Sequence, residues 1–218
     1  MTPDVPPSLR DAVKRDLRPT RPLMSPLVRA LVLTPLAFAI VLGVPQMHFF
    51  RPDMAAIGFL KAWGFSFGQA LAGLVIVAAA LRESIPGRSL SRGAVAGTIA
   101  VGLAIPAALF VLTASTFDTG PAPGGALEEG AVCFRVSALS AVPALIAAAW
   151  LASRALPVRP ALAGALYGLG CGLVADAGLR LYCEYTVPEH VLIAHGGAIV
   201  GAMLVGACIA VIIARRRA

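Results

Sequence analysis

Six long apolar runs dominate the chain, and short polar or turn-forming segments separate them. Each run holds about 20 or more mostly apolar residues, the length that an α-helix needs to cross a bilayer. The runs cover approximately residues 28–48, 55–81, 93–114, 132–153, 160–182 and 189–214. The pattern therefore predicts an all-α fold, a polytopic membrane protein built as a six-transmembrane-helix bundle.

The segments between the runs are too short for a second folded domain. They contain the turn residues Gly, Pro, Asp and Ser, as in "RESIPGRSLSR" and "STFDTGPAPGGALEEG". We expect three parts: a cytoplasmic N-terminal arm at 1–27, a transmembrane domain at 28–214 and a basic tail at 215–218.

The positions of the basic residues predict the orientation of the spans. Placing both termini in the cytoplasm puts 14 of the 18 Lys and Arg residues on the cytoplasmic side, as the positive-inside rule requires. Seven acidic residues then fall toward the outer side: Asp53, Asp118, Glu128, Glu129, Asp176, Glu184 and Glu189.

Composition supports the membrane assignment and narrows the function. Hydrophobic residues make up 58 % of the chain, charged residues only 13 %, and the mean hydropathy is +0.84. The net charge of +7 follows from the basic residues at the span ends, so it does not indicate a nucleic-acid surface. We expect the lipid bilayer as a partner and no direct nucleic-acid partner.

Small residues spaced four apart predict close helix packing. Such ladders let backbones approach where lipid removes the hydrophobic drive between helices. They occur in the second span (Gly64, Gly68), the fifth (Gly164, Gly168, Gly172) and the sixth (Gly197, Gly201).

One ionisable pair lies in the fifth span. Asp176 precedes Arg180 by four residues, which places both side chains on one helix face. An intramembrane carboxylate is by default a functional candidate. Near the outer end, and with this partner, we interpret it as a structural ion pair.

Two of the four cysteines fall at the predicted outer surface. Cys133 opens the fourth span and Cys183 closes the fifth, whereas Cys171 and Cys208 lie inside spans. Two thiols on the oxidising side can form a disulfide, remain unpaired or hold a soft or heavy metal ion. His190 is the candidate third metal ligand, and Glu184, Glu189 and His195 lie nearby in sequence. No other cofactor is expected.

No catalytic motif is present. The chain lacks GxxxxGK[ST], GxGxxG after a strand, HExxH and GxSxG. We expect no enzyme activity and no small-molecule substrate.

The N-terminal arm carries an apolar stripe within a charged segment. Leu9, Val13 and Leu17 recur every four residues, as on one face of a short helix. Arg18-Pro19 and Arg21-Pro22 favour extended backbone up to Leu23 and the membrane. Charge orientation alone does not require the stripe or the prolines, so the arm is a candidate site for a protein partner.

Several motifs together resemble one family. They are the six-span plan, "DLRPTRPL" in the arm, the outer Cys133, "LPVRPALAGALYGL" at the start of the fifth span and "LRLYCEYTVPEHV" at its end. This combination resembles the negative regulator of sigma F family of bacterial integral-membrane anti-sigma factors. The family's exit motif typically reads His-Cys-Pro-Glu, whereas here Tyr182 precedes Cys183 and Glu184 follows it directly.

The resemblance implies a multi-pass protein of the bacterial inner (plasma) membrane. Such proteins hold an extracytoplasmic-function-type sigma factor through cytoplasmic segments and release it on an envelope, heavy-metal or redox signal. By this resemblance, Cys133 and Cys183 match the sensing pair, and the Leu17–Leu23 stretch matches the cytoplasmic motif. The alternative is a small inner-membrane transporter or metal-handling permease with Asp176, Cys183 and His190 at its outer mouth.

Overall fold

The computed structural model describes residues 6–16, 22–114, 126–155, 157–185 and 187–217. These residues form helices, turns and irregular segments, with no strand among them. Six helical segments are long and apolar enough to cross a membrane: Pro26–Met47, Phe59–Glu83, Arg92–Leu112, Glu128–Ser153, Pro160–Leu179 and Pro188–Arg215. The prediction of an all-α fold with six such helices is confirmed.

The first two spans are interrupted near their N-terminal ends. The first divides into α2 (Pro26–Leu31) and α3 (Thr34–Met47). The break precedes Pro35, whose ring would clash with the carbonyl of the residue four positions earlier in a continuous helix. The predicted second span, 55–81, divides into α4 (Met54–Ile57) and α5 (Phe59–Glu83) at Gly58, which has a φ of 88°. This backbone conformation suits glycine.

The remaining helices differ from the predicted spans mainly at the end that carries the cysteines. They are α6 (Arg92–Ala114), α7 (Ala126–Ser153), α8 (Pro160–Leu179), α9 (Pro188–Val191), the π-helix η1 (Leu192–Gly196) and α10 (Gly197–Arg215). Because α7 begins at Ala126, Cys133 lies about two turns inside that helix instead of opening it. Because α8 ends at Leu179, Cys183 lies in the turn that follows it.

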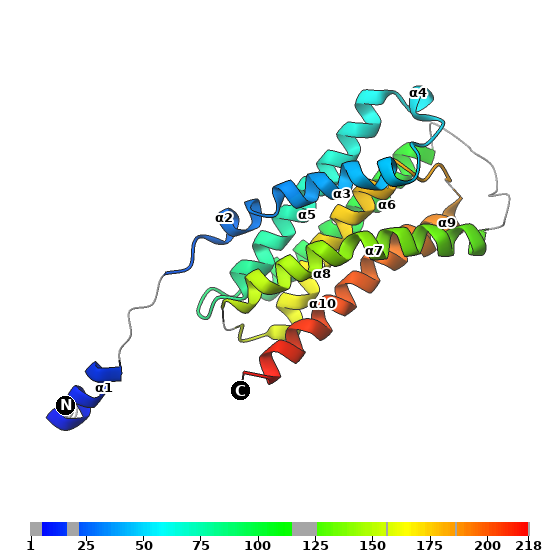
Figure 1. Ribbon diagram of the computed structural model, residues 1–218. Coiled ribbons are helices and arrows are strands. Elements are labelled where there is room, and N and C mark those ends of the chain that lie inside the picture. The colour runs from blue at the N-terminus through cyan, green and yellow to red at the C-terminus, as the bar shows by residue number, and fades with distance from the viewer. Residues whose placement is uncertain (1–5, 17–21, 115–125, 156, 186, 218) are drawn as a thin grey trace.

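Helix α8 lies in the middle of the bundle (Figure 1), packed against α3, α5, α7 and α10. Within its most apolar stretch, 89 % of the residues are buried inside the protein, against 11 % for α6. Its buried side chains include Leu166, Leu169 and Leu173, each fully enclosed. A shift of either end of α8 therefore disturbs its contacts with most of the other helices.

Glycines set the closest helix approaches. A Cβ at Gly164 or Gly168 on α8 would collide with the carbonyl oxygens of Gly206 and Ala202 on α10. The predicted ladder on α8 therefore does serve packing. The prediction for Gly64 and Gly68 was wrong: no atom lies within 4 Å of a Cβ built at either position, because this face of α5 turns away from its neighbours.

A buried carboxylate links three chain segments at the end of the bundle opposite the cysteines. Glu83 at the end of α5 receives two hydrogen bonds from Arg159, at 2.7 and 2.9 Å, and a third from the Leu90 backbone N–H at 2.7 Å. Arg159 also donates to the Leu90 carbonyl at 2.8 Å. This clamp joins α5, the segment after it and the start of α8.

Candidate functional site

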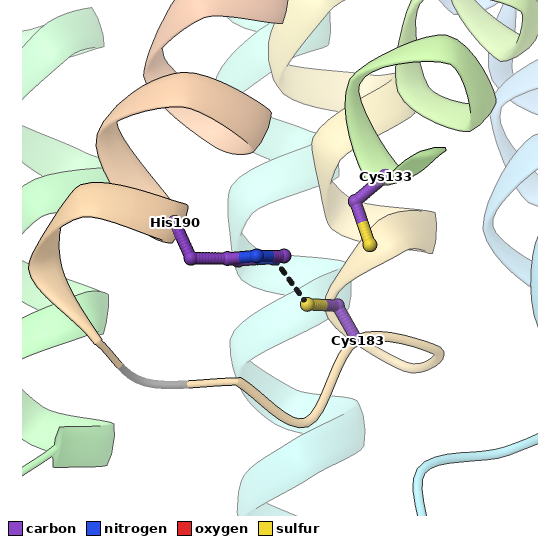
Figure 2. Close-up of side chains that lie close together, drawn as sticks. All are labelled: Cys133, Cys183 and His190. Atoms are coloured by element: carbon purple, nitrogen blue, oxygen red, sulfur yellow. Dashed lines mark hydrogen bonds between the residues drawn. The ribbon is translucent and has the colours of Figure 1, made fainter. Parts of the chain in front are cut away.

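Three side chains of types that can ligate a metal ion, contributed by three different segments, meet at one end of the bundle. Cys133 comes from α7, Cys183 from the turn after α8 and His190 from α9, as Figure 2 shows. Their ligand atoms all lie within 4.8 Å of one another. The Cys183 sulfur lies 3.1 Å from Nε2 of His190. All three side chains are buried, and we call them the thiol site.

Local backbone structure brings Cys183 and His190 together. After α8 the chain turns tightly, with the Cys183 N–H donating to the Leu179 carbonyl at 2.7 Å. Pro188 then opens α9 at a position where its missing N–H costs no hydrogen bond. The short loop between them returns the chain so that the His190 ring faces the Cys183 thiol.

The composition of the thiol site suits a soft divalent metal ion. Thiolate and imidazole ligands select zinc and softer metals over Mg²⁺ or Ca²⁺. Three protein ligands leave one position of a tetrahedral ion for another donor. Nδ1 of His190 is buried and has no hydrogen-bond partner among the described residues. The same two sulfurs, both free thiols, are also near enough for oxidation to a disulfide after a small shift.

The environment of Cys183 keeps its sulfur protonated. A hydrogen bond with Cys133 and then burial raise the pKa of the Cys183 thiol, and contacts with His190 and His195 oppose this only partly. The thiol form therefore prevails at neutral pH. A metal ion or an oxidant must remove this proton before a sulfur–metal or sulfur–sulfur bond forms.

A second buried cluster lies next to the thiol site and is centred on Asp176. The sequence pairs Asp176 with Arg180, and the structure places their charged atoms 3.6 Å apart. Two other partners are closer: Nδ1 of His195 at 2.5 Å and Nε2 of Gln69 at 2.6 Å. Asp176 is fully buried, so these contacts replace the water that its carboxylate would otherwise bind.

The Asp176 cluster spans several helices. Arg180 donates to the Gln69 side-chain oxygen on α5 and to the Pro106 carbonyl on α6, both at 2.9 Å. Arg51, in the segment after α3, donates to the Arg180 carbonyl at 3.3 Å. The single carboxylate thus connects α5, α6, α8 and η1 through one set of hydrogen bonds.

His195 joins the Asp176 cluster to the thiol site. One side of its ring bonds Asp176, and the ring also interacts with the Cys183 thiol. A small cavity of about 20 Å³ lies beside this junction, lined by Arg51, Phe110, Arg180, Cys183, Tyr185, Val191 and His195. This volume holds about one water molecule.

Sequence reasoning missed two members of the Asp176 cluster. It did not identify Gln69, although an amide in an apolar span requires a hydrogen-bond partner and was a usable signal. It considered His195 only as a metal ligand, not as the partner of a carboxylate 19 residues earlier. Glu189 is exposed and Glu184 half-buried, and neither belongs to the thiol site.

The remaining cysteines lie apart from the thiol site. Cys171 is buried in the core, where burial suits a small apolar side chain, and Cys208 is exposed on α10.

The arm residues also lie apart from the thiol site. Leu9 and Val13 are exposed on α1 (Pro7–Asp16), and Pro22 and Leu23 are exposed in an irregular segment. Leu17, Arg18, Pro19 and Arg21 fall outside the described residues.

Comparison with known proteins gave one match. The family model described as negative regulator of sigma F matches residues 14–215, which includes all six spans and both clusters. Comparison with curated proteins and comparison with solved structures found no match.

Proposed function

The chain belongs to the negative regulator of sigma F family, and from this membership we propose that it is a membrane-bound anti-sigma factor. It holds a sigma factor of the extracytoplasmic-function type at the inner membrane. It releases this partner when an envelope, heavy-metal or redox signal reaches Cys133 and Cys183. Both termini face the cytoplasm in this arrangement, as the basic residues at the span ends favour.

In this proposal the N-terminal arm binds the sigma factor. Leu9 and Val13 are about half exposed, at 54 % and 51 %, on a helix with charged neighbours. A ten-residue helix with one apolar stripe is marginal alone in water and is ordered by a groove that accepts the stripe. Residues 17–23 continue this contact surface toward the membrane in the proposal.

The proposal that the protein senses a metal or redox signal rests on the proximity of Cys133, Cys183 and His190. Binding of a soft metal ion would tie α7, the turn after α8 and α9 to one centre and displace the thiol protons. Oxidation to a disulfide would join two of these elements, α7 and the turn after α8, and would leave His190 on α9 unbonded. With a peroxide as oxidant, two thiols and one peroxide give one disulfide, and the peroxide is reduced to water or to water and an alcohol.

The Asp176 cluster provides the route from the thiol site to the cytoplasmic end. His195 contacts both Cys183 and Asp176, and Asp176 lies on α8, the central helix. A change at Cys183 therefore alters a hydrogen bond to the helix that packs against most of the bundle. Because α8 begins beside the Glu83–Arg159 clamp, a shift of α8 reaches the connections that face the partner.

Two measurements test the proposal. Full-length protein in nanodiscs should capture the purified sigma factor, and Leu9→Asp with Val13→Asp should abolish the capture while Leu71→Asn, on a lipid-facing position, should not. In cells, Cys133→Ser and Cys183→Ser should each prevent induction of sigma-dependent transcription by cadmium or peroxide, with Cys208→Ser as the control. Normal induction in both cysteine variants would remove the thiol site from the mechanism.

A further inference from the structure

A recess at the end of the bundle opposite the thiol site has twelve lining residues, of which six are alanines. Its walls come from the ends of α7 and α10, the start of α8 and the residues between α7 and α8, and its volume is about 190 Å³. The wall residues that we call the alanine recess are Ala149, Ala152, Ala155, Ala163, Ala210 and Ala214. Figure 1 shows that these helix ends, and the start of α2, lie at the same end of the bundle.

The walls of the recess are held by packing that does not depend on an occupant. Tyr167, at the side of the recess, donates a hydrogen bond of 2.8 Å to the Gly206 carbonyl on α10. Gly164 and Gly206 let α8 and α10 touch backbone to backbone just beside it. Because these helices cannot approach further along this face, the recess is present before any partner arrives.

The size of the recess decides what it can hold. Sites for small-molecule ligands usually measure about 300–1,000 Å³ and carry several polar groups. A recess of about 190 Å³ with mainly apolar walls has room for one or two apolar side chains. Such pockets receive the buried anchor residues that contribute most of the binding energy in protein interfaces.

The rim of the recess is basic. Arg217 lines it and donates to the Ser153 carbonyl, and Arg154, Arg215 and Arg216 are exposed close by in sequence. No acidic side chain lines the recess among the described residues. An apolar anchor carried on an acidic segment would meet complementary charge at Arg217.

The recess also lies near the point where the arm enters the bundle. Arg29 on α2 is buried and donates to the Leu151 carbonyl on α7. Leu151 is adjacent to Ala152 and lies within one turn of Ala149 and Ser153, which line the recess. One protein bound to the arm can therefore contact the recess as well.

We propose that the alanine recess is a second docking point for the sigma factor, where it accepts an apolar anchor residue from an acidic amphipathic helix. The inference rests on the proposed function, because it assigns this surface to the same partner. It adds the chemistry of that partner's contact: a Leu, Met or Phe side chain flanked by Asp or Glu. Release then follows when a shift of α8 closes or distorts the recess.

The test fills the recess without touching the arm. Ala214→Phe places a large side chain in it, and the matched control Ala96→Phe adds the same side chain at an exposed position of α6. Binding of purified sigma factor to full-length protein in nanodiscs gives the dissociation constant. We expect Ala214→Phe to raise it at least about tenfold and Ala96→Phe to leave it unchanged. Gel filtration and thermal unfolding verify that both variants fold.

A second variant keeps the inference testable if Ala214→Phe does not fold. Arg215→Glu with Arg216→Glu reverses charge at the rim, and we expect weaker binding with a smaller dependence on salt. Unchanged affinity in the variants that fold overturns the docking point. Failure of the wild type to bind any sigma factor would instead overturn the proposed function, so the two failures are distinguishable.

Discussion

The Asp176 carboxylate lies 2.5 Å from Nδ1 of His195, and this contact joins the central helix to the segment that carries the thiol site. The pair is buried, and Gln69 and Arg180 complete the surroundings of the carboxylate. A buried charge in such a setting depends on its partners, because no water replaces them when they are lost.

We therefore expect Asp176→Ala to destabilise the protein strongly. Removing one member of a buried ionic cluster typically costs about 3–5 kcal/mol. The double variant with His195→Ala should cost less than the sum of the two single changes, with a coupling of at least about 1 kcal/mol. Denaturant unfolding in detergent measures all three variants. Additive losses would mean that the two side chains act independently.

Metal binding should require the thiol site. Titration with Co²⁺ is expected to give one equivalent and the absorption bands of a thiolate-bound cobalt ion. Cys183→Ser should remove these bands, and His190→Gln should weaken binding by at least about tenfold, since even outer-shell changes cost this much. Cys208→Ser, the exposed thiol on α10, is the control. Bands that persist without Cys183 would place the cobalt elsewhere.

The Glu83–Arg159 clamp should contribute to stability at the opposite end. Glu83→Gln removes the charge that receives hydrogen bonds from Arg159 and Leu90. Since hydrogen bonds to charged groups contribute about 1.5–3 kcal/mol each before relaxation, we expect a loss of roughly 2–3 kcal/mol. Thermal unfolding of Glu83→Gln measures this loss of stability. Arg88→Ala, a change at an exposed position in the neighbouring segment, is the control. Equal stability of the two variants would argue against the clamp.

Close approach of α8 and α10 makes Gly168 intolerant of side chains. A Cβ there would overlap the Ala202 carbonyl, so Gly168→Val must push the helices apart, at a cost of about 1–3 kcal/mol or more. Gly64→Val, where nothing lies within 4 Å, should change stability far less. Unfolding transitions of the two variants give the comparison, and similar values would contradict the packing argument.

The sequence predicted the parts of the structure that depend on local pattern. The lengths of the apolar runs predicted the six helices. The positions of Cys133 and Cys183 at neighbouring ends of predicted spans predicted that both lie close to His190. It did not predict contacts between distant polar groups. Gln69 and Asp176 are 107 residues apart, and Glu83 and Arg159 are 76 apart, so nothing in their neighbours indicates the pairing.

Helix boundaries were the other source of error, for identifiable reasons. Hydropathy does not register that the first helix is broken just before Pro35, or that α7 includes Glu128 and Glu129 in its first turns. Acidic residues in a first helical turn are favoured by the helix dipole even where they lower hydropathy. Cys133 was therefore predicted at the start of its helix, whereas it lies about two turns after the start of α7.

The burial of α8 also has a consequence for sequence variation. A helix whose apolar surface is mostly exposed, such as α6, needs only to remain apolar, so it tolerates exchange among Leu, Val, Ile and Phe. On α8 nearly every position touches another helix, so side-chain volume rather than hydropathy limits what each position accepts. A complete substitution scan should therefore divide these two apolar helices into one restricted by size and one restricted only by polarity.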